Sequence, residues 1–144
     1  MVLNFDCFKD TLHFINENIS IDNETNETKP LDVAEIYKAD KLSQYSKADI
    51  YLSLCYLSDM HYIILIFKPL NHKRMLFRVD AVTIEGQNFY FSTLKPSTWD
   101  ALKEKAQTLG GAALKFIGDT VQKCAVTATA TAATVVTNKL IDGQ

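Results

Sequence analysis

The sequence predicts an α+β fold: two N-terminal helices, a four-stranded antiparallel meander, and a long C-terminal helix broken near Gly110-Gly111. Three observations carry this prediction. Apolar residues recur at helical spacing up to residue 40, and again from residue 96 onward. Between these regions, residues 49–93 show short apolar or alternating runs that are separated by turn residues. A sheet must bury at least one face, and the flanking helices are the elements that can cover it.

The N-terminal region is expected to hold two helices. Residues 4–18 repeat large apolar side chains at spacings of three and four, with Asn4 as a candidate N-cap: Phe5, Phe8, Leu12 and Ile15. A polar, acidic loop follows over residues 18–28. Thr28-Lys29-Pro30 then resembles a helix start, and this predicts a second helix over residues 30–40.

The middle of the chain is interpreted as four strands, over residues 49–57, 62–67, 74–84 and 89–93. The first alternates in side-chain character, which is typical of a half-buried strand. The uninterrupted apolar run 62–67 indicates a central strand covered on both faces. The apolar parity changes between Val79 and Val82, which predicts a bulge near Asp80-Ala81.

The C-terminal third returns to a helical pattern. Residues 96–109 predict a helix that starts with a capping-box-like Ser97 and Asp100. After the two glycines the pattern resumes to about Leu140. It carries a seam of apolar and small residues at spacings of three and four: Leu114, Ile117, Val121, Ala125, Ala128, Ala132 and Val135. Alanines along a seam let two backbones approach closely. The expected organisation is a core domain over 1–109 and a C-terminal helix over 110–144.

Three interpretations of this C-terminal helix stay open. With so few charges it needs a surface to pack on, and that surface is its own core, a protein partner or a membrane. A protein partner includes a second copy of the chain. The polar side of the helix is mostly threonine with three lysines, so its attraction to anionic lipid is weak: Lys115, Lys123 and Lys139.

A basic hairpin is the second candidate binding feature. Five residues that are cationic or can become so cluster around one predicted turn: Lys68, His72, Lys73, Arg74 and Arg78. A cationic turn can bind phosphate head groups or an acidic protein surface. The competing interpretation is a solvated loop whose charges protect an exposed strand from aggregation.

Composition excludes some classes of function. The chain has 144 residues, a net charge of −2 and a pI of about 5.9, which indicate one domain and argue against a nucleic-acid binder. Three widely spaced cysteines, and no signal-peptide pattern after Met1, predict a cytoplasmic protein with reduced thiols.

Catalytic and metal-binding motifs are not readable in the sequence. It shows no glycine-rich phosphate loop, no nucleophile elbow and no HExxH motif. The repeated spacings Cys7-x5-His13 and Cys55-x5-His61 are longer than typical zinc-ligand spacings. We therefore expect no cofactor, no metal and no catalytic residue. An enzyme with a dispersed site stays as a third functional hypothesis.

Residues 89–109, a predicted strand running into a helix that contains Trp99, resemble the end of a pleckstrin-homology domain. The similarity covers this segment alone, and such a shape analogy implies nothing specific about function.

The preferred functional hypothesis is a non-catalytic interaction protein: an adaptor, an assembly subunit or an inhibitor. Its contact element would be the C-terminal helix, and its partner another protein or itself. The alternative is a peripheral phospholipid-binding module that uses the basic hairpin over residues 68–78.

Overall fold

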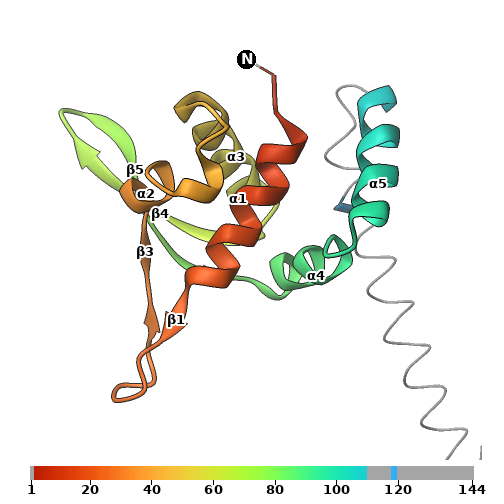
Figure 1. The fold of residues 1–144 in the computed structure, drawn as a ribbon. Coiled ribbons are helices and arrows are strands. Elements are labelled where there is room, and N and C mark those ends of the chain that lie inside the picture. Colours follow the sequence, from red (N-terminus) through yellow and green to blue (C-terminus); the bar gives the residue numbers. More distant parts are fainter. Residues whose placement is uncertain (1, 110–117, 120–144) are drawn as a thin grey trace, which may run out of the picture. The chain divides into compact units, whose positions relative to one another are not determined.

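A computed structural model describes residues 2–109 and 118–119 (Figure 1). The chain divides into two compact units, one up to Tyr90 and one from Phe91 onward. Within the described residues the fold is α+β, with five α-helices and two small antiparallel sheets of two and three strands. The α+β prediction is confirmed, and the four-stranded meander is wrong. The predicted seam from Leu114 to Val135 lies outside the described residues.

Helix α1 (Phe5–Asn18) follows the sequence prediction closely. The side chain of Asn4 caps it, because its Oδ1 accepts a hydrogen bond from the backbone N–H of Cys7 at 3.1 Å. The apolar stripe of the helix, which includes Phe8, Leu12 and Ile15, is buried. This stripe forms one wall of the core.

The segment after α1 is more extended than expected. Strands β1 (Ser20–Ile21) and β2 (Thr28–Lys29) close the acidic loop as a small hairpin. Strand β3 (Leu31–Asp32) leads into a short helix, α2 (Val33–Tyr37), and a 3-10 turn, η1 (Asp40–Leu42). The predicted helix over 30–40 therefore starts too early, because Leu31 buries its side chain by pairing with Val79 of the larger sheet.

The predicted strand over residues 49–57 is wrong, since helix α3 (Lys47–Asp59) occupies this segment. The Ser46 hydroxyl accepts a hydrogen bond from the Asp49 N–H at 3.1 Å and caps the helix. Ile50, Leu54 and Leu57 are buried on one helical face. Apolar residues are so dense here that they fit an alternating pattern as well as a helical one.

Strands β4 (Ile63–Leu70) and β5 (Lys73–Val82) form the predicted hairpin, with β5 between β3 and β4. The two turn residues, Asn71 and His72, have φ angles of 50° and 65°, as a type I′ turn requires. The predicted bulge is confirmed, because Ile64 pairs with Ala81 and Leu65 with Val79, which leaves Asp80 as the extra residue. The expectation that 62–67 is covered on both faces is wrong, since Ile64 is exposed.

The predicted strand over residues 89–93 is also wrong, because helix α4 (Ile84–Ser92) lies there. The Thr83 hydroxyl accepts from the Gly86 N–H at 3.1 Å and starts the helix. Gly86 is required by packing rather than by a turn, because a Cβ at this position would collide with the carbonyl oxygen of Tyr62. Without a last strand, the resemblance to a pleckstrin-homology domain is not supported.

Helix α5 (Pro96–Leu109) confirms the predicted helix over 96–109 and buries Trp99, Leu102 and Ala106. It begins at Pro96, because the Trp99 N–H already donates to the Lys95 carbonyl at 3.2 Å. The expected capping role of Ser97 is therefore wrong. A proline in the first turn suits a helix start, where its missing N–H has no intrahelical acceptor.

An aromatic cluster marks the core of the first unit. The rings of Phe8 and Phe89 meet edge to face with centroids 5.5 Å apart, and Tyr62 lies 5.2 Å from Phe89. These three residues come from α1, α4 and the segment before β4, so the cluster joins the helices to the base of the hairpin. Among the helices that the structure describes, none is long and apolar enough to cross a bilayer.

Candidate functional site

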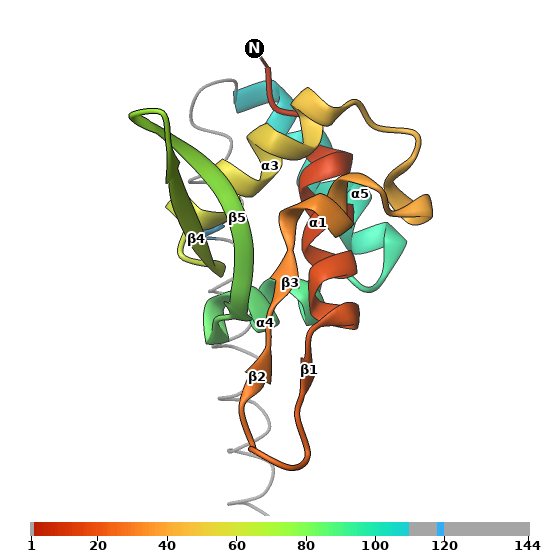
Figure 2. The same ribbon diagram turned by 90° about the vertical axis from the view of Figure 1, so that its left-hand side faces the viewer.

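The β4–β5 hairpin projects from the first unit and carries all five predicted basic residues (Figures 1 and 2). Lys68 lies on β4, His72 in the turn, and Lys73, Arg74 and Arg78 on β5. The first four are exposed, and Arg78 is half-exposed. The tight turn brings these residues together, as the sequence predicted.

Large apolar side chains are exposed between these cations. Directly paired residues share a face of a sheet, so Lys68 lies beside Met75 and Leu70 beside Lys73. The exposed apolar residues of the hairpin, with their exposed fractions, are Ile64 (49%), Leu70 (51%), Met75 (48%) and Phe77 (38%). We define the hairpin surface as Lys68, Leu70, His72, Lys73, Arg74, Met75, Phe77 and Arg78.

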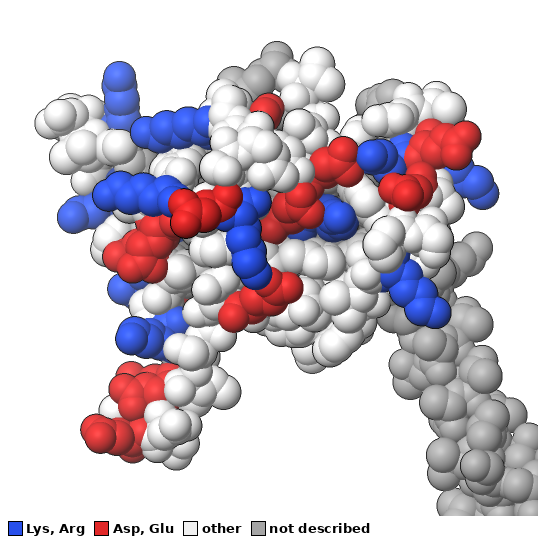
Figure 3. Space-filling view, viewed as in Figure 1, with Lys and Arg blue, Asp and Glu red and all other residues white. Residues whose placement is uncertain are grey.

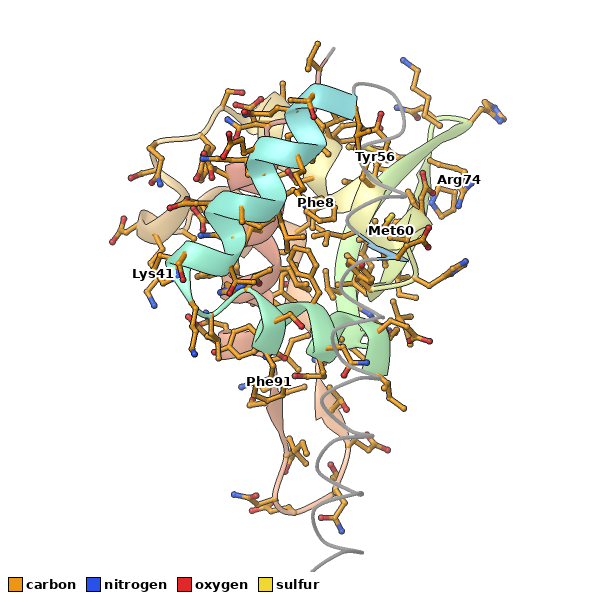
Figure 4. The ribbon with its side chains drawn as sticks, turned by 90° about the vertical axis from the view of Figure 1, so that its right-hand side faces the viewer. Phe8, Lys41, Tyr56, Met60, Arg74 and Phe91 are labelled. Carbon is orange, nitrogen blue, oxygen red and sulfur yellow. The ribbon has the colours of Figure 1, made fainter. Side chains whose placement is uncertain are left out.

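Aromatic rings orient three of the cations. The Arg74 guanidinium lies 4.2 Å from the centroid of Phe67. Lys68 and Arg78 both approach the ring of Phe77, at 5.4 and 5.5 Å. Each such contact contributes about 0.5–1 kcal/mol at an exposed site. Figure 4 shows Arg74 on the hairpin, apart from Phe8 in the interior. The charged groups therefore stay at the surface while their stems cover apolar atoms.

The hairpin surface has a positive field that acids of the same unit barely reduce. Arg78 donates to Asp80 with an Nε–Oδ1 distance of 2.7 Å. In the part of the chain that the structure describes, no carboxylate lies within ion-pair distance of Lys68, Lys73 or Arg74. Residues 64–79 contain four Lys or Arg and no Asp or Glu. An anionic partner would therefore meet cations with little internal competition.

A second concave site lies between α1 and η1 and was not identified from the sequence. This pocket has a volume of about 350 Å³ and is lined by Asp10, His13, Phe14, Glu17, Lys41 and Leu42. Figure 4 shows Lys41 and Arg74 on opposite sides of the first unit. The pocket is thus separate from the hairpin surface. Its residues come from α1 and from a turn some thirty positions later, and no local sequence signal joins them.

Each carboxylate that lines this pocket has a partner. Asp10 accepts a hydrogen bond from the Tyr45 hydroxyl at 2.5 Å, and Glu17 pairs with Lys41 at 3.3 Å. Burial, with help from nearby Lys9, lowers the pKa of His13 below its usual 6.5. Burial and the bond to Asp10 raise the pKa of Tyr45. These pairs make the pocket a polar link between α1 and the η1 region.

The cysteine–histidine spacings do not come together as a metal site. Cys7 is buried, with its Sγ 3.6 Å from the Thr11 hydroxyl, and burial raises the pKa of its thiol. His13 instead lies against Tyr90, with ring centroids 4.7 Å apart. Among residues 2–109 and 118–119, no three His, Cys, Asp or Glu side chains gather as metal ligands would.

Comparison with protein families, with characterised proteins and with solved structures finds no match to this chain. Its function is therefore argued from the geometry of the hairpin surface and the pocket.

Proposed function

We propose that this chain is a non-catalytic protein-interaction protein, and that the hairpin surface is a contact element for an acidic protein partner. One observation carries the proposal. Lys68, Lys73 and Arg74, which have no carboxylate neighbour in the described structure, alternate with exposed Leu70 and Met75 on one projecting hairpin.

The competing interpretation is that these charges protect a strand edge. Lysines and arginines on edge strands do suppress pairing between molecules. A protective edge, however, has no use for exposed Leu70, Met75 and Phe77, because exposed apolar side chains favour association. An apolar patch bordered by charges is typical of an interaction site. The side-chain pattern therefore favours recognition over protection.

The length of the apolar stripe favours a protein over a membrane. Exposed apolar residues run from Ile64 to Leu70 along β4, which corresponds to about 20 Å at a strand rise of about 3.3 Å per residue. A peripheral element inserts roughly 5–10 Å into a bilayer interface. A partner surface that lies alongside the strands would cover the whole stripe.

An anionic phospholipid surface is the second candidate, and one specific observation favours it. Leu70 and Met75 flank the turn, and Lys68 and Lys73 lie directly beside them. This places aliphatic groups at the tip with cations close behind, where each cation near an anionic membrane contributes about 1 kcal/mol.

The other two hypotheses rest on other parts of the chain. Association through the predicted helix over 112–140 stays a prediction, and it would add a second contact element to the hairpin. A dispersed enzyme site would have to use the polar pocket. Both carboxylates there are already paired, so the pocket supports a structural link rather than proton transfer.

Two probes separate the candidates. One is a fluorescent peptide of alternating Glu and Leu, followed by anisotropy, and the other is phosphatidylcholine vesicles with or without phosphatidylserine, followed by sedimentation. We expect saturable peptide binding that weakens at least about tenfold between about 50 and 500 mM NaCl, because screening shortens the reach of the hairpin charges. Lys73→Glu with Arg74→Glu should abolish this binding. The matched control, Lys38→Glu with Lys105→Glu, makes the same charge change at exposed positions elsewhere.

The outcomes decide between the candidates. Binding to phosphatidylserine vesicles but not to the peptide would select the membrane candidate. Binding to neither probe, or equal binding by both variants, would overturn the hairpin as a contact element.

A further inference from the structure

We infer that the acidic β1–β2 hairpin of one molecule docks on the hairpin surface of a second copy, so that copies associate head to tail. This inference rests on the proposed function and names the partner of the same surface.

The acidic hairpin is an exposed loop with an ordered backbone. Its exposed carboxylates are Asp22, Glu24 and Glu27. The Asp22 N–H donates to the Glu27 carbonyl and the Asn26 N–H donates to the Asp22 carbonyl, both at 2.8 Å. Asp22 Oδ1 also accepts from the Glu24 N–H at 2.9 Å. The loop thus presents its carboxylates from a defined turn rather than from a flexible tail.

The charges of the two hairpins are complementary. Residues 20–28 contain three acids and no Lys or Arg, whereas residues 64–79 contain four Lys or Arg and no acid. Figure 3 shows Asp and Glu gathered on the β1–β2 hairpin and Lys and Arg over the β4–β5 hairpin. In the described part of the chain, none of the three acids forms an ion pair. Opposite fields of this kind steer two surfaces together and set their orientation.

Apolar exposure is complementary as well. Ile21, beside the acids, is 64% exposed, and Leu70 and Met75 are exposed beside the cations. Contact between the two hairpins would cover aliphatic groups at the centre and place opposite charges around them. This arrangement, an apolar centre with a polar rim, is the usual anatomy of a protein interface.

The two hairpins cannot meet within one molecule. Both belong to the first unit, and Figures 1 and 2 show the β1–β2 loop and the β4–β5 turn at opposite ends of it. Each contact therefore uses the acidic hairpin of one copy and the basic hairpin of the next. Because the two surfaces differ, every added copy leaves one of each unoccupied, and association continues beyond a dimer unless a ring closes.

Sedimentation velocity on the full chain tests this inference. We expect the mean mass to rise with protein concentration from about 5 to about 500 μM at about 25 mM NaCl, and to return to that of the monomer at about 500 mM NaCl. Glu24→Lys with Glu27→Lys should be monomeric at low salt, and so should Lys73→Glu with Arg74→Glu. Asp22 stays unchanged because its side chain supports the loop. The control, Glu35→Lys with Glu104→Lys, should associate like the original chain.

Mixing the two charge-reversed variants sharpens the test. Each is self-repelling, but the intact basic hairpin of one meets the intact acidic hairpin of the other, so the mixture should associate again. Far-ultraviolet circular dichroism shows whether the variants are folded. A monomeric original chain at low salt, or association of the acidic-hairpin variant like the original, would overturn the inference. If the acidic peptide still binds the hairpin surface in that case, the proposed function stands and the second copy is the wrong partner.

Discussion

The base and the tip of the β4–β5 hairpin belong to the same two strands but face different surroundings. At the base, Ile63, Leu65 and Val79 are buried, and the adjoining Tyr62 contacts the aromatic core. At the tip, Leu70 and Met75 are exposed among cations. Burial at the base anchors the hairpin to the fold, whereas exposure at the tip contributes little to stability and leaves those side chains available for contact. The difference separates residues that hold the structure from residues that a partner would recognise.

One substitution made at both ends of β4 gives the largest contrast. Leu65→Ala should lower the free energy of unfolding by roughly 2–3 kcal/mol, because it leaves a cavity at a buried position. Leu70→Ala should change it by less than about 0.5 kcal/mol, since that side chain is exposed. Urea unfolding of both variants measures the two values. Equal losses would show that the tip belongs to the core.

Gly86→Ala tests the base from the helix side. The added Cβ would meet the backbone oxygen of Tyr62, which cannot move as a side chain can. We expect a loss of about 1–2 kcal/mol despite the better helix propensity of alanine. Thermal or urea unfolding measures it. Unchanged or increased stability would mean that α4 does not pack this closely on the segment before β4.

Ser46→Ala tests whether the body packs a helix where the sequence pattern suggested a strand. Loss of the hydroxyl that caps α3 should cost about 1 kcal/mol. Ser46→Asp is the matched control, because aspartate also accepts a hydrogen bond at an N-cap and should keep the stability. If alanine and aspartate behave alike, the capping role of Ser46 is refuted.

The pH dependence of stability follows from His13. Burial lowers its pKa in the folded state, so protonation favours the unfolded chain. The stabilising contribution of the neutral ring is complete above the unfolded pKa near 6.5, and it is lost as pH falls through the folded pKa. Urea midpoints measured between about pH 7 and pH 5 should therefore fall less for His13→Gln than for the original chain. Parallel curves would contradict this assignment.

The smallest effect is expected at the tip. Lys73→Glu with Arg74→Glu should leave the free energy of unfolding within about 0.5 kcal/mol of the original, because both side chains are exposed and neither pairs with a described acid. A loss above about 1 kcal/mol would place these residues in the fold rather than in a contact surface.

Local signals predicted the elements that do not depend on distant partners. Helix α1 has a clear apolar stripe and a cap at Asn4, and the parity change after Val79 located the bulge at Asp80. The basic hairpin was predicted because its cations are close in sequence. These features need short stretches of chain and nothing else.

The errors came from segments where two patterns compete or where tertiary contacts decide. The same Ser-x-x-Asp pattern occurs at Ser46 and at Ser97, yet it caps a helix at the first position, while at the second Pro96 already starts the helix. Gly86 suggested a turn, but its role is a close approach to Tyr62 that no local pattern reveals. The polar pocket depends on pairs such as Asp10 and Tyr45, which are distant in sequence.

The turn at Asn71-His72 has a consequence for the entropy of binding. Neither residue is glycine, although both hold positive φ angles, so the turn has fewer accessible conformations than a glycine turn would have. Leu70 and Lys73, which flank it, are therefore restricted before any partner arrives. Association then loses less conformational freedom at this tip than it would at a glycine-rich loop, and more of the contact energy remains as affinity.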